Sequence, residues 1–450
     1  MIKTKKYSAG QIAKIVDGRL IGKDLIIDKI STDTREESLE GACFFALKGK
    51  NYNAEDFIDT AIEKGANVII STKDCPKSIA SIIVNDTTEA FLALARHNKG
   101  KTRIIGITGS NGKTTVKEML YSIFSKQYKT SCTFDNHNNE LGVAEALLSI
   151  TDEEFCIVEM GMRALGEISL LSSLTSPYIS VITSIGASHI GRLGSYEDIF
   201  KAKTEILDFA SGFAVVPAEE KFKGICYKDT LPIFVGSGGD FEARGISYTQ
   251  NGIKFLVRDN NLSKEYLIEV PSAFEHDCHN ATMAFSVAKI CDIKTEFIKS
   301  GILEFKNCKN RGEIIKKQDI TIINDTYNAS FDSVKSAILS LKKYAINNKI
   351  THTFAILGAM LENGERAEEF HLKIGQIAKE NSIENIYTYG ELGKDICRGF
   401  GGGACFDTKE DLENYILENM MPNSLYLVKA SRKEGFETIA EKMKERLNEY

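Results

Sequence analysis

Short apolar runs of the kind that form buried strands recur through the middle of the chain, with amphipathic stretches between them. The clearest run covers residues 103–108 and is followed by apolar positions at helical spacing over residues 116–124. Further runs cover residues 155–159, 179–183 and 213–216. Because strands that alternate with helices pair in parallel and are covered by those helices, this pattern predicts an α/β fold with a mostly parallel sheet.

The last part of the chain, from about residue 310, repeats this alternation. Apolar runs cover residues 321–324, 353–357 and 425–428, again with helical patterns between them. The pattern predicts a second, Rossmann-like α/β unit.

A polar segment separates the first part of the chain from the middle. Residues 88–98 have helical apolar spacing, and the flexible sequence Lys-Gly-Lys follows at residues 99–101. A chain of 450 residues is also too long for one ordinary core. We therefore predict three domains, which cover residues 1–98, 99–309 and 310–450.

Composition and charge narrow the class of protein. The chain is 43% hydrophobic and 26% charged, with a formal net charge of -6, so nothing indicates a nucleic-acid or anionic-membrane partner. No apolar run has the length of a membrane span, and the lysines near the start precede no apolar stretch, so neither a membrane anchor nor a signal peptide is predicted. The 10 cysteines are scattered without a C-x-x-C pair, which favours reduced thiols in a cytoplasmic protein over disulfides or a zinc site.

The strongest local signal of chemistry is the segment GSNGKTT at residues 109–115. It lies between a predicted strand and a predicted helix, which is the context of a phosphate-binding loop. Glycines let backbone N–H groups turn toward phosphates, and the start of a helix adds partial positive charge. Lys113 can reach the β- and γ-phosphates of a nucleotide, and Thr114 can hold Mg²⁺. The predicted cofactor-binding residues of this segment are Gly109, Asn111, Gly112, Lys113, Thr114 and Thr115.

The general phosphate-loop pattern G-x-x-x-x-G-K-[ST] is not met, because its first glycine falls at Ile107. The alternative is a glycine-rich turn without a ligand. Since GKT directly after a strand is a motif with a mechanism, the phosphate loop is favoured.

Three further polar residues are associated with the ends of other predicted strands. Glu159 ends one apolar run, His189 lies in the loop after the next run, and Lys203 lies on the helix that follows. Ligand sites in open α/β sheets lie at such strand ends, and carboxylate oxygens suit Mg²⁺ beside ATP. Singly, these residues are more often an ion-pair partner, a structural histidine and a solvated lysine. Their common position predicts that Glu159 and His189 complete a Mg²⁺ site with Thr114.

A set of spaced segments resembles the Mur ligases. They read ITGSNGKTT, NHNNELG, VEMG, SIGASH, AKTEI, NDTYNAS and LGAMLENGE. The resemblance covers nearly the whole chain, from TDTR at residues 32–35 and FALKG at residues 45–49 to Ser431 and Arg432. It implies an N-terminal domain for the UDP end of a substrate, a central ATPase with a shortened phosphate loop, and a C-terminal domain that closes over ATP and takes an amine substrate. The implied activity is ATP-dependent amide-bond formation through an acyl-phosphate in cell-wall precursor synthesis, with ATP and Mg²⁺ as cofactors.

The resemblance also assigns roles to single residues. It implies that Lys203 is carbamylated, which converts an ammonium into a carboxylate that can bind Mg²⁺. The alternatives for Lys203 are a side chain in solvent and a cation that contacts a substrate phosphate. The implied catalytic residues are Lys113, Glu159, His189 and Lys203, of which the last three are metal ligands together with Thr114. Further nucleotide contacts are implied at Asn280, Arg311, Asp325, Tyr327 and Asn328, with Arg311 and Asp325 in a cleft between the second and third domains. Substrate contacts are implied at Thr32, Asp33, Arg35, Lys48, Asn138 and Asn139.

The substrates implied by the resemblance are a UDP-linked muramoyl peptide and D-alanyl-D-alanine, joined by a monomeric enzyme. The Asp-Asn-Pro-Arg motif of the relative that adds a diamino acid is absent, which favours the dipeptide as the amine. The chain departs from the family at several positions. Where the family has Leu-Gly-Asp-Met, this chain has Ala359 in place of the aspartate, and where the family has Asn-Ala-Asn-Pro, the last two residues are Ser330 and Phe331. The Leu-Glu that often follows the histidine in the family is Ile190-Gly191 here. The family's Asp-Gly-His in the N-terminal part is Asn53-Ala54-Glu55 here.

Three alternatives remain open. One is a paralogue that joins another amine to another acid, and a second is a folylpolyglutamate synthase, which the UDP-type N-terminal segment disfavours. The third is a nucleotide-binding regulator without catalysis. The joint presence of Lys113, Glu159, His189 and Lys203 argues against it.

Overall fold

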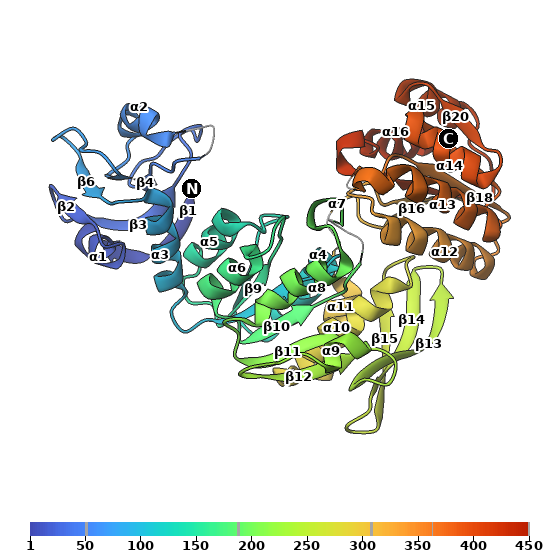
Figure 1. The fold of residues 1–450 in the computed structure, drawn as a ribbon, viewed down its shortest axis with the longest axis horizontal. Helices are drawn as coiled ribbons and strands as arrows, with labels where there is room; N and C mark the ends of the chain where they lie inside the picture. The colour runs from blue at the N-terminus through green and yellow to red at the C-terminus, as the bar shows by residue number, and fades with distance from the viewer. Residues whose placement is uncertain (50–52, 187–189, 307–308, 362, 449–450) are drawn as a thin grey trace.

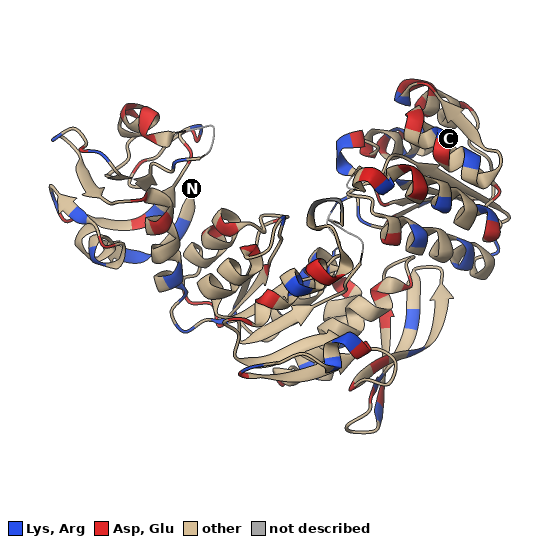
Figure 2. Ribbon diagram, in the orientation of Figure 1, with Lys and Arg blue, Asp and Glu red and all other residues tan. Residues whose placement is uncertain are grey.

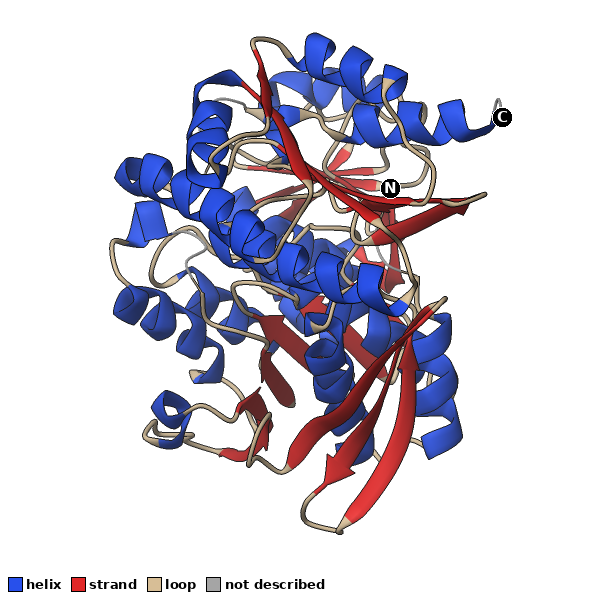
Figure 3. Ribbon diagram, turned by 90° about the vertical axis from the view of Figure 1, so that its right-hand side faces the viewer, coloured by secondary structure: helices blue, strands red, loops and turns tan. Residues whose placement is uncertain are grey.

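The computed structural model describes residues 1–49, 53–186, 190–306, 309–361 and 363–448. These residues form three sheets that follow one another along the chain and are packed with helices (Figures 1 and 3). The N-terminal part, blue in Figure 1, and the C-terminal part, orange to red, lie at opposite ends of the central part. The predicted α/β class with three sheet-containing domains is confirmed, whereas the exact domain boundaries stay a prediction.

The N-terminal sheet has the strand order β1-β3-β4-β5-β6-β2. Strands β3 to β6 are parallel, and β1 and β2 pair antiparallel at the two edges. Strands β4 and β5 are buried at every position, which explains why Ser71 is the only polar residue in the two strands. The elements are β1 (Ile2–Ser8), α1 (Ala9–Ile15), β2 (Arg19–Ile21), β3 (Ile26–Ser31), β4 (Cys43–Phe45), η1 (Ala54–Phe57), α2 (Ile58–Glu63), β5 (Val68–Ser71), β6 (Ala80–Ile83) and α3 (Thr87–Lys99).

The central sheet has the order β15-β14-β13-β12-β11-β10-β7-β9-β8. The apolar runs predicted as strands form its parallel middle, with β7 between β9 and β10. Strands β13, β14 and β15 add an antiparallel extension that the sequence pattern did not predict. The elements are β7 (Arg103–Thr108), α4 (Lys113–Phe124), β8 (Thr130–Cys132), α5 (Glu140–Leu148), β9 (Phe155–Glu159), α6 (Glu167–Thr175), β10 (Ile179–Ile182), α7 (Ile190–Leu193), α8 (Tyr196–Thr204), η2 (Glu205–Leu207), β11 (Gly212–Pro217), α9 (Glu220–Lys223), β12 (Thr230–Val235), β13 (Phe241–Thr249), β14 (Gly252–Asp259), β15 (Lys264–Val270), α10 (His276–Ile290) and α11 (Thr295–Glu304).

The C-terminal sheet has the order β16-β17-β21-β18-β19-β20. Strand β16 is antiparallel to β17, and the strands from β17 to β20 are parallel, as expected for a Rossmann-like unit. The elements are β16 (Glu313–Lys317), β17 (Ile320–Asn324), α12 (Phe331–Asn347), β18 (His352–Leu357), η3 (Gly364–Arg366), α13 (Ala367–Glu380), β19 (Asn385–Tyr389), α14 (Gly390–Phe400), β20 (Ala404–Phe406), α15 (Lys409–Glu418), β21 (Ser424–Lys429), η4 (Arg432–Glu434) and α16 (Glu437–Asn448).

A buried asparagine joins the N-terminal and central parts. The Nδ2 group of Asn98, near the end of α3, donates to the carbonyl oxygens of Leu147, Leu148 and Ile150 at 2.8 to 3.0 Å. Its Oδ1 atom accepts hydrogen bonds from the hydroxyls of Thr4 and Tyr7. Since buried amide groups without partners are costly, this network ties the orientation of the first sheet to helix α5.

Helix α12 connects the C-terminal part to the central part at both of its ends. At its start, the hydroxyl of Ser330 lies 3.4 Å from Oδ1 of Asn111 in the phosphate loop. At its other end, the Tyr344 hydroxyl donates to the carbonyl oxygen of Gln250, in the turn between β13 and β14, at 3.4 Å. The central and C-terminal parts therefore meet beside the phosphate loop.

Charged residues of both signs are interspersed over all three parts (Figure 2). Among the described residues, the helices are too short or too polar to cross a bilayer.

Candidate functional site

The phosphate loop connects the end of β7 to the start of α4, as predicted. Gly109 has a φ of +149° and Gly112 a φ of +84°, conformations that side chains disfavour. A Cβ atom on Gly109 would lie 2.0 Å from Oγ1 of Thr183, and one on Gly112 would lie 2.4 Å from Oδ1 of Asn280. Both positions therefore require glycine, and the loop turns tightly without the additional glycine of the general motif.

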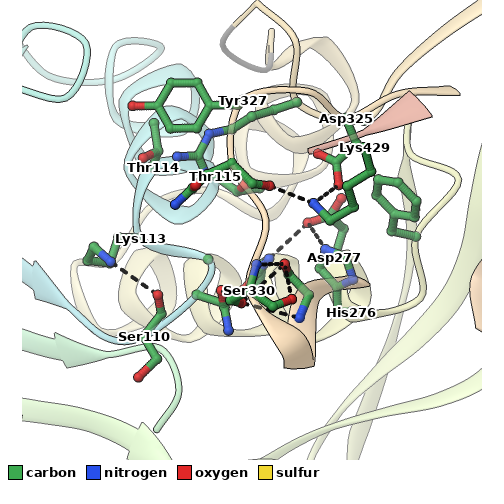
Figure 4. Close-up of a pocket in the computed structure, with 18 residues that line it drawn as sticks. Ser110, Lys113, Thr114, Thr115, His276, Asp277, Asp325, Tyr327, Ser330 and Lys429 are labelled. Carbon is green, nitrogen blue, oxygen red and sulfur yellow. Dashed lines mark hydrogen bonds and ion pairs between the residues drawn. The ribbon is translucent and has the colours of Figure 1, made fainter. Parts of the chain in front are cut away.

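The amine of Lys113 lies within this loop rather than in open solvent. It donates to the carbonyl oxygens of Gly109 at 2.7 Å and Ser110 at 3.3 Å, and Figure 4 shows the side chain folded toward Ser110. Helix α4 begins at Lys113 without a side-chain cap from Gly112. Uncapped N–H groups at a helix start and an adjacent ammonium form a suitable binding site for phosphate oxygens.

Glu159 lies at the end of β9, beside β7. Its side chain is buried, and its Oε2 atom accepts a hydrogen bond from the Thr114 hydroxyl at 2.8 Å. Its Oε1 atom accepts one from Nδ2 of Asn138 at 2.9 Å. One carboxylate and one hydroxyl are hard oxygen donors, and Mg²⁺ in nucleotide sites takes few protein ligands beside phosphates and water. The pair fits Mg²⁺, although no group of three or more His, Cys, Asp or Glu residues that could hold a metal occurs in the described part of the chain.

Lys203 is fully buried on α8. Its Nζ atom has no hydrogen-bond partner among the residues that the structure describes. Burial, followed by repulsion from Lys113, holds the pKa of this amine well below its usual range, although Glu159 acts in the opposite direction. The alternative of a Lys203 side chain in solvent is therefore wrong, because the side chain is fully buried.

His189 lies outside the described residues, so its predicted role stays a prediction. The strand end that precedes it lies against the phosphate loop. Ser110 donates its N–H to the carbonyl oxygen of Ser184 at 2.8 Å, and Gly186 donates its N–H to the Ser110 hydroxyl at 2.9 Å. The loop that leads to His189 thus begins beside the phosphate loop.

A cleft between the central and C-terminal parts opens onto the phosphate loop (Figure 4). Of the predicted nucleotide contacts, Asn280, Arg311, Asp325, Tyr327 and Asn328 line this cleft. Further lining residues that sequence reasoning did not assign to the nucleotide are Ser110, Phe274, His276, Asp277, Gly312, Ser330, Ser333 and Lys429. Ser330 lies in the segment NDTYNAS, whereas the others outside the phosphate loop are single residues of common types that carry no local signal in the sequence.

The C-terminal wall of the cleft is built from charged side chains and a ring. Lys429 pairs with Asp325 at 2.5 Å and donates to the carbonyl oxygen of Asn328 at 2.8 Å. The guanidinium of Arg311 stacks on the Tyr327 ring, with 3.9 Å between its Cζ atom and the ring centroid. The Nε atom of Arg311 is buried and has no hydrogen-bond partner among the described residues, and Arg311 lines the cleft, where its guanidinium presents positive charge to an anionic ligand.

The predicted substrate contacts do not all come together. Thr32, Asp33, Arg35 and Lys48 belong to the N-terminal part and do not line the cleft. The Arg35 side chain is 90% exposed and pairs with Asp33 at 2.7 Å. Asn138 contacts Glu159, whereas Asn139 caps helix α5 by accepting the Gly142 N–H at 2.9 Å.

Replacing Glu159 by glutamine should raise the Mg²⁺ concentration for half-maximal ATP turnover at least about tenfold. Glutamine keeps the shape of the side chain and can still accept the hydroxyl hydrogen of Thr114, so the fold should persist. The measurement is a Mg²⁺ titration of phosphate release, with the exposed Glu140→Gln as the control. An unchanged titration would show that Glu159 is structural.

Replacing Arg311 by alanine should raise the KM for ATP by about 10- to 100-fold, as expected for the loss of a charge-assisted hydrogen bond. The reason is the buried, unpartnered Nε atom in the cleft wall. Steady-state kinetics with varied ATP measure the effect, and Arg398→Ala, at an exposed arginine, serves as the control. An ATP KM equal to that of the control would exclude Arg311 from the nucleotide site.

Two family models match the chain over the parts that form this cleft. The model described as the Mur ligase middle domain matches residues 107–288. The model described as the Mur ligase, glutamate ligase domain, matches residues 310–432.

Individual relatives match over nearly the full length. The chain is 33% identical to the UDP-N-acetylmuramoyl-tripeptide--D-alanyl-D-alanine ligase of Bacillus subtilis, over 95% of this chain and 96% of the relative. Identity to the Escherichia coli protein of the same name is 29%, over 97% and 98% of the two chains. Among solved structures, MurF from Acinetobacter baumannii superposes with a TM-score of 0.90 at 28% identity, over 99% of this chain and 100% of that chain.

Proposed function

Because the chain belongs to the Mur ligase family, we propose that it is an ATP-dependent ligase that joins D-alanyl-D-alanine to the peptide carboxylate of UDP-N-acetylmuramoyl-tripeptide. The observation that carries the proposal is the meeting of the phosphate loop, buried Glu159 and buried Lys203 at one edge of the central sheet, opposite the charged C-terminal wall. The two substrates are those named in the full-length relatives.

The proposed reaction has two steps. The γ-phosphoryl group of ATP passes to the peptide carboxylate, which gives an acyl-phosphate and ADP. The amine of D-alanyl-D-alanine then attacks the acyl carbon, loses a proton, and displaces inorganic phosphate as the amide bond forms. Water would hydrolyse the acyl-phosphate, so an interdomain cleft that excludes water suits this chemistry.

The residues of the cleft take distinct parts in this reaction. Lys113 and the N–H groups at the start of α4 bind and orient the phosphates, and they offset the charge that develops during phosphoryl transfer. Thr114 and Glu159 would hold Mg²⁺, and His189 and a carbamylated Lys203 would add ligands. Mg²⁺, when bound, supplies positive charge beside the phosphates. Arg311, Asn280 and Asp325 hold the nucleotide from the two sides of the cleft.

The N-terminal residues Thr32, Asp33, Arg35 and Lys48 are proposed to contact the UDP end of the acid substrate. We propose that the enzyme acts as a monomer. Because the reaction consumes ATP, we propose that it takes place in the cytoplasm.

A second candidate, a ligase for another amine, is favoured by one specific observation. Ala359 replaces the family's aspartate in the loop after β18, which removes a carboxylate from the C-terminal part. The backbone of this loop is held in place, because Ser431 donates its N–H to the carbonyl oxygen of Ala359 at 3.1 Å and Met360 donates its N–H to Nε2 of His371 at 2.9 Å. A different side chain at position 359 therefore changes the surface offered to the amine.

Mass spectrometry of the products tests the proposal and separates the two candidates. The enzyme is incubated with UDP-N-acetylmuramoyl-tripeptide, ATP, Mg²⁺ and D-alanyl-D-alanine, in parallel with L-alanyl-L-alanine and single amino acids. We expect a product that is heavier than the acid by one dehydrated D-alanyl-D-alanine. Product with another amine alone would support the second candidate, and no product with any amine would contradict ligase activity on this acid.

A further inference from the structure

A second lysine of helix α4 is buried beside the candidate metal site. Lys117 lies one turn after Lys113 and Thr114 and is fully buried, although lysine is almost never fully buried without partners. Its Nζ atom donates to the carbonyl oxygens of Thr133 at 3.0 Å and Asp135 at 2.8 Å, and it pairs with Glu118 at 3.0 Å. These three acceptors match the three donors of an ammonium, so Lys117 has no donor left for a ligand.

The segment that Lys117 holds leads directly to Glu159. Within residues 133–138, the Thr133 hydroxyl accepts the backbone N–H of Glu159 at 3.0 Å. At the other end of the segment, Nδ2 of Asn138 donates to the carboxylate of Glu159 at 2.9 Å. The segment therefore contacts Glu159 through both its backbone and its side chain.

Apolar packing does not explain the conformation of this segment. Phe134 is 77% exposed, and the side chains of Asn136 and His137 are exposed as well. Asp135 has a φ of +43°, which is unfavourable for an aspartate and must be held by its surroundings. The hydrogen bonds from Lys117 lie on both sides of Phe134, so they restrain the part of the segment that packing leaves unsupported.

We propose that Lys117 is a positioning residue for the reaction: by clamping residues 133–138 it places Asn138 and Thr133 on Glu159 and so orients the carboxylate that would bind Mg²⁺. The expected change in Mg²⁺ dependence rests on the proposed function, whereas the contacts that join Lys117, residues 133–138 and Glu159 do not. Groups that orient a metal ligand influence metal affinity nearly as strongly as the ligand, typically by about 10- to 100-fold.

The experiment replaces Lys117 by methionine, which has a similar length but no charge and no donor. The matched control is Lys126→Met, which removes a cation just beyond the end of α4 that pairs with Glu304 at 2.7 Å, away from Glu159. For Lys117→Met we expect about a tenfold higher Mg²⁺ concentration for half-maximal ATP turnover, with a smaller change in kcat at saturating Mg²⁺. For the control we expect no change. A folded Lys117→Met variant with the wild-type Mg²⁺ dependence would overturn the proposal.

Hydrogen exchange in the metal-free, ligand-free protein provides a readout that does not depend on activity. Faster exchange confined to residues 133–138 and their neighbours in Lys117→Met would support the clamp, whereas uniformly faster exchange would indicate a general loss of stability and contradict it. If the wild-type protein forms no product, the proposed function fails, and the exchange result still decides the clamp.

A double-mutant cycle with Asn138→Ala separates positioning from mere stabilisation. If Lys117 acts through Asn138, the effect of Lys117→Met on Mg²⁺ dependence should largely disappear in the Asn138→Ala background, and full additivity would contradict this.

Should Lys117→Met fail to fold, Thr133→Val removes the hydroxyl that accepts the Glu159 N–H, and Thr133→Ser retains it. A Mg²⁺ shift in Thr133→Val but not in Thr133→Ser is expected, and no shift in either would overturn the proposal.

Discussion

Replacing Lys113 by alanine is expected to lower kcat for product formation by about 10³-fold, the upper range for removal of one charge-stabilising donor. The Lys113 ammonium lies in the phosphate loop at the start of α4, where a transferred phosphoryl group would develop negative charge. Its two hydrogen bonds to loop carbonyls are local, so the free energy of unfolding should fall by only about 1 kcal/mol.

Phosphate release and thermal unfolding of the variant measure these two effects. Lys129→Ala, at an exposed lysine paired with Asp152, is the control for loss of a positive charge elsewhere. Near-normal phosphate release in a folded Lys113→Ala variant would show that the phosphate-loop assignment is wrong. A large loss of stability would show instead that the lysine is structural.

Replacing Lys203 by alanine is expected to lower activity by about 10²- to 10³-fold, and short carboxylates such as formate or acetate should restore part of it. The reason is the chemical form of the Lys203 side chain. Burial, followed by repulsion from Lys113, lowers the pKa of the Lys203 amine well below its usual range and so favours the neutral form. A neutral amine can attack CO₂ and lose a proton to form a carbamate. The carbamate that results has a negative charge that Lys113 and Mg²⁺ would stabilise.

The unpartnered Nζ atom of Lys203 favours this chemistry over a permanent ammonium. A buried cation without a hydrogen-bond partner is strongly disfavoured, and a second cation, Lys113, already acts on this group. A carbamate would have oxygens that can accept hydrogen bonds or bind metal. Alanine at this position leaves space in which a small carboxylate can occupy the place of the carbamate.

Rescue by carboxylates distinguishes the two remaining roles of Lys203, a carbamate that binds metal and a cation that contacts a substrate phosphate. A cationic role toward a substrate phosphate predicts no rescue by carboxylates, although short amines should then restore activity. Full activity in Lys203→Ala would exclude both roles. A ¹³C NMR signal of a carbamate after incubation with labelled bicarbonate, present in the wild type and absent in the variant, provides direct evidence. Lys201→Ala, two residues earlier on the exposed face of α8, should behave like the wild type.

Features that depend on neighbouring residues in the chain were predictable. The apolar runs at residues 103–108 and 155–159 became β7 and β9 with the same bounds, because a run buried on both faces of a parallel sheet is apolar throughout. The GKT sequence after a strand located the turn into α4. The antiparallel extension β13 to β15 was not predicted, because its residues alternate between buried and partly exposed positions and form no apolar run.

Features that depend on residues distant in the chain required the folded structure. The sequence indicated that Lys203 and Glu159 were candidates for metal binding and catalysis. How α8 and β9 pack decides that both side chains are buried and that the Lys203 amine has no hydrogen-bond partner among the described residues. The same holds for Lys429, whose pairing with Asp325 joins positions 104 residues apart, and for Lys117. Periodicity and motifs report local geometry, whereas desolvation and ion pairing depend on which groups the completed fold places around each charge. Only packing therefore distinguished the buried Lys117, Lys203 and Lys429 from lysines in solvent.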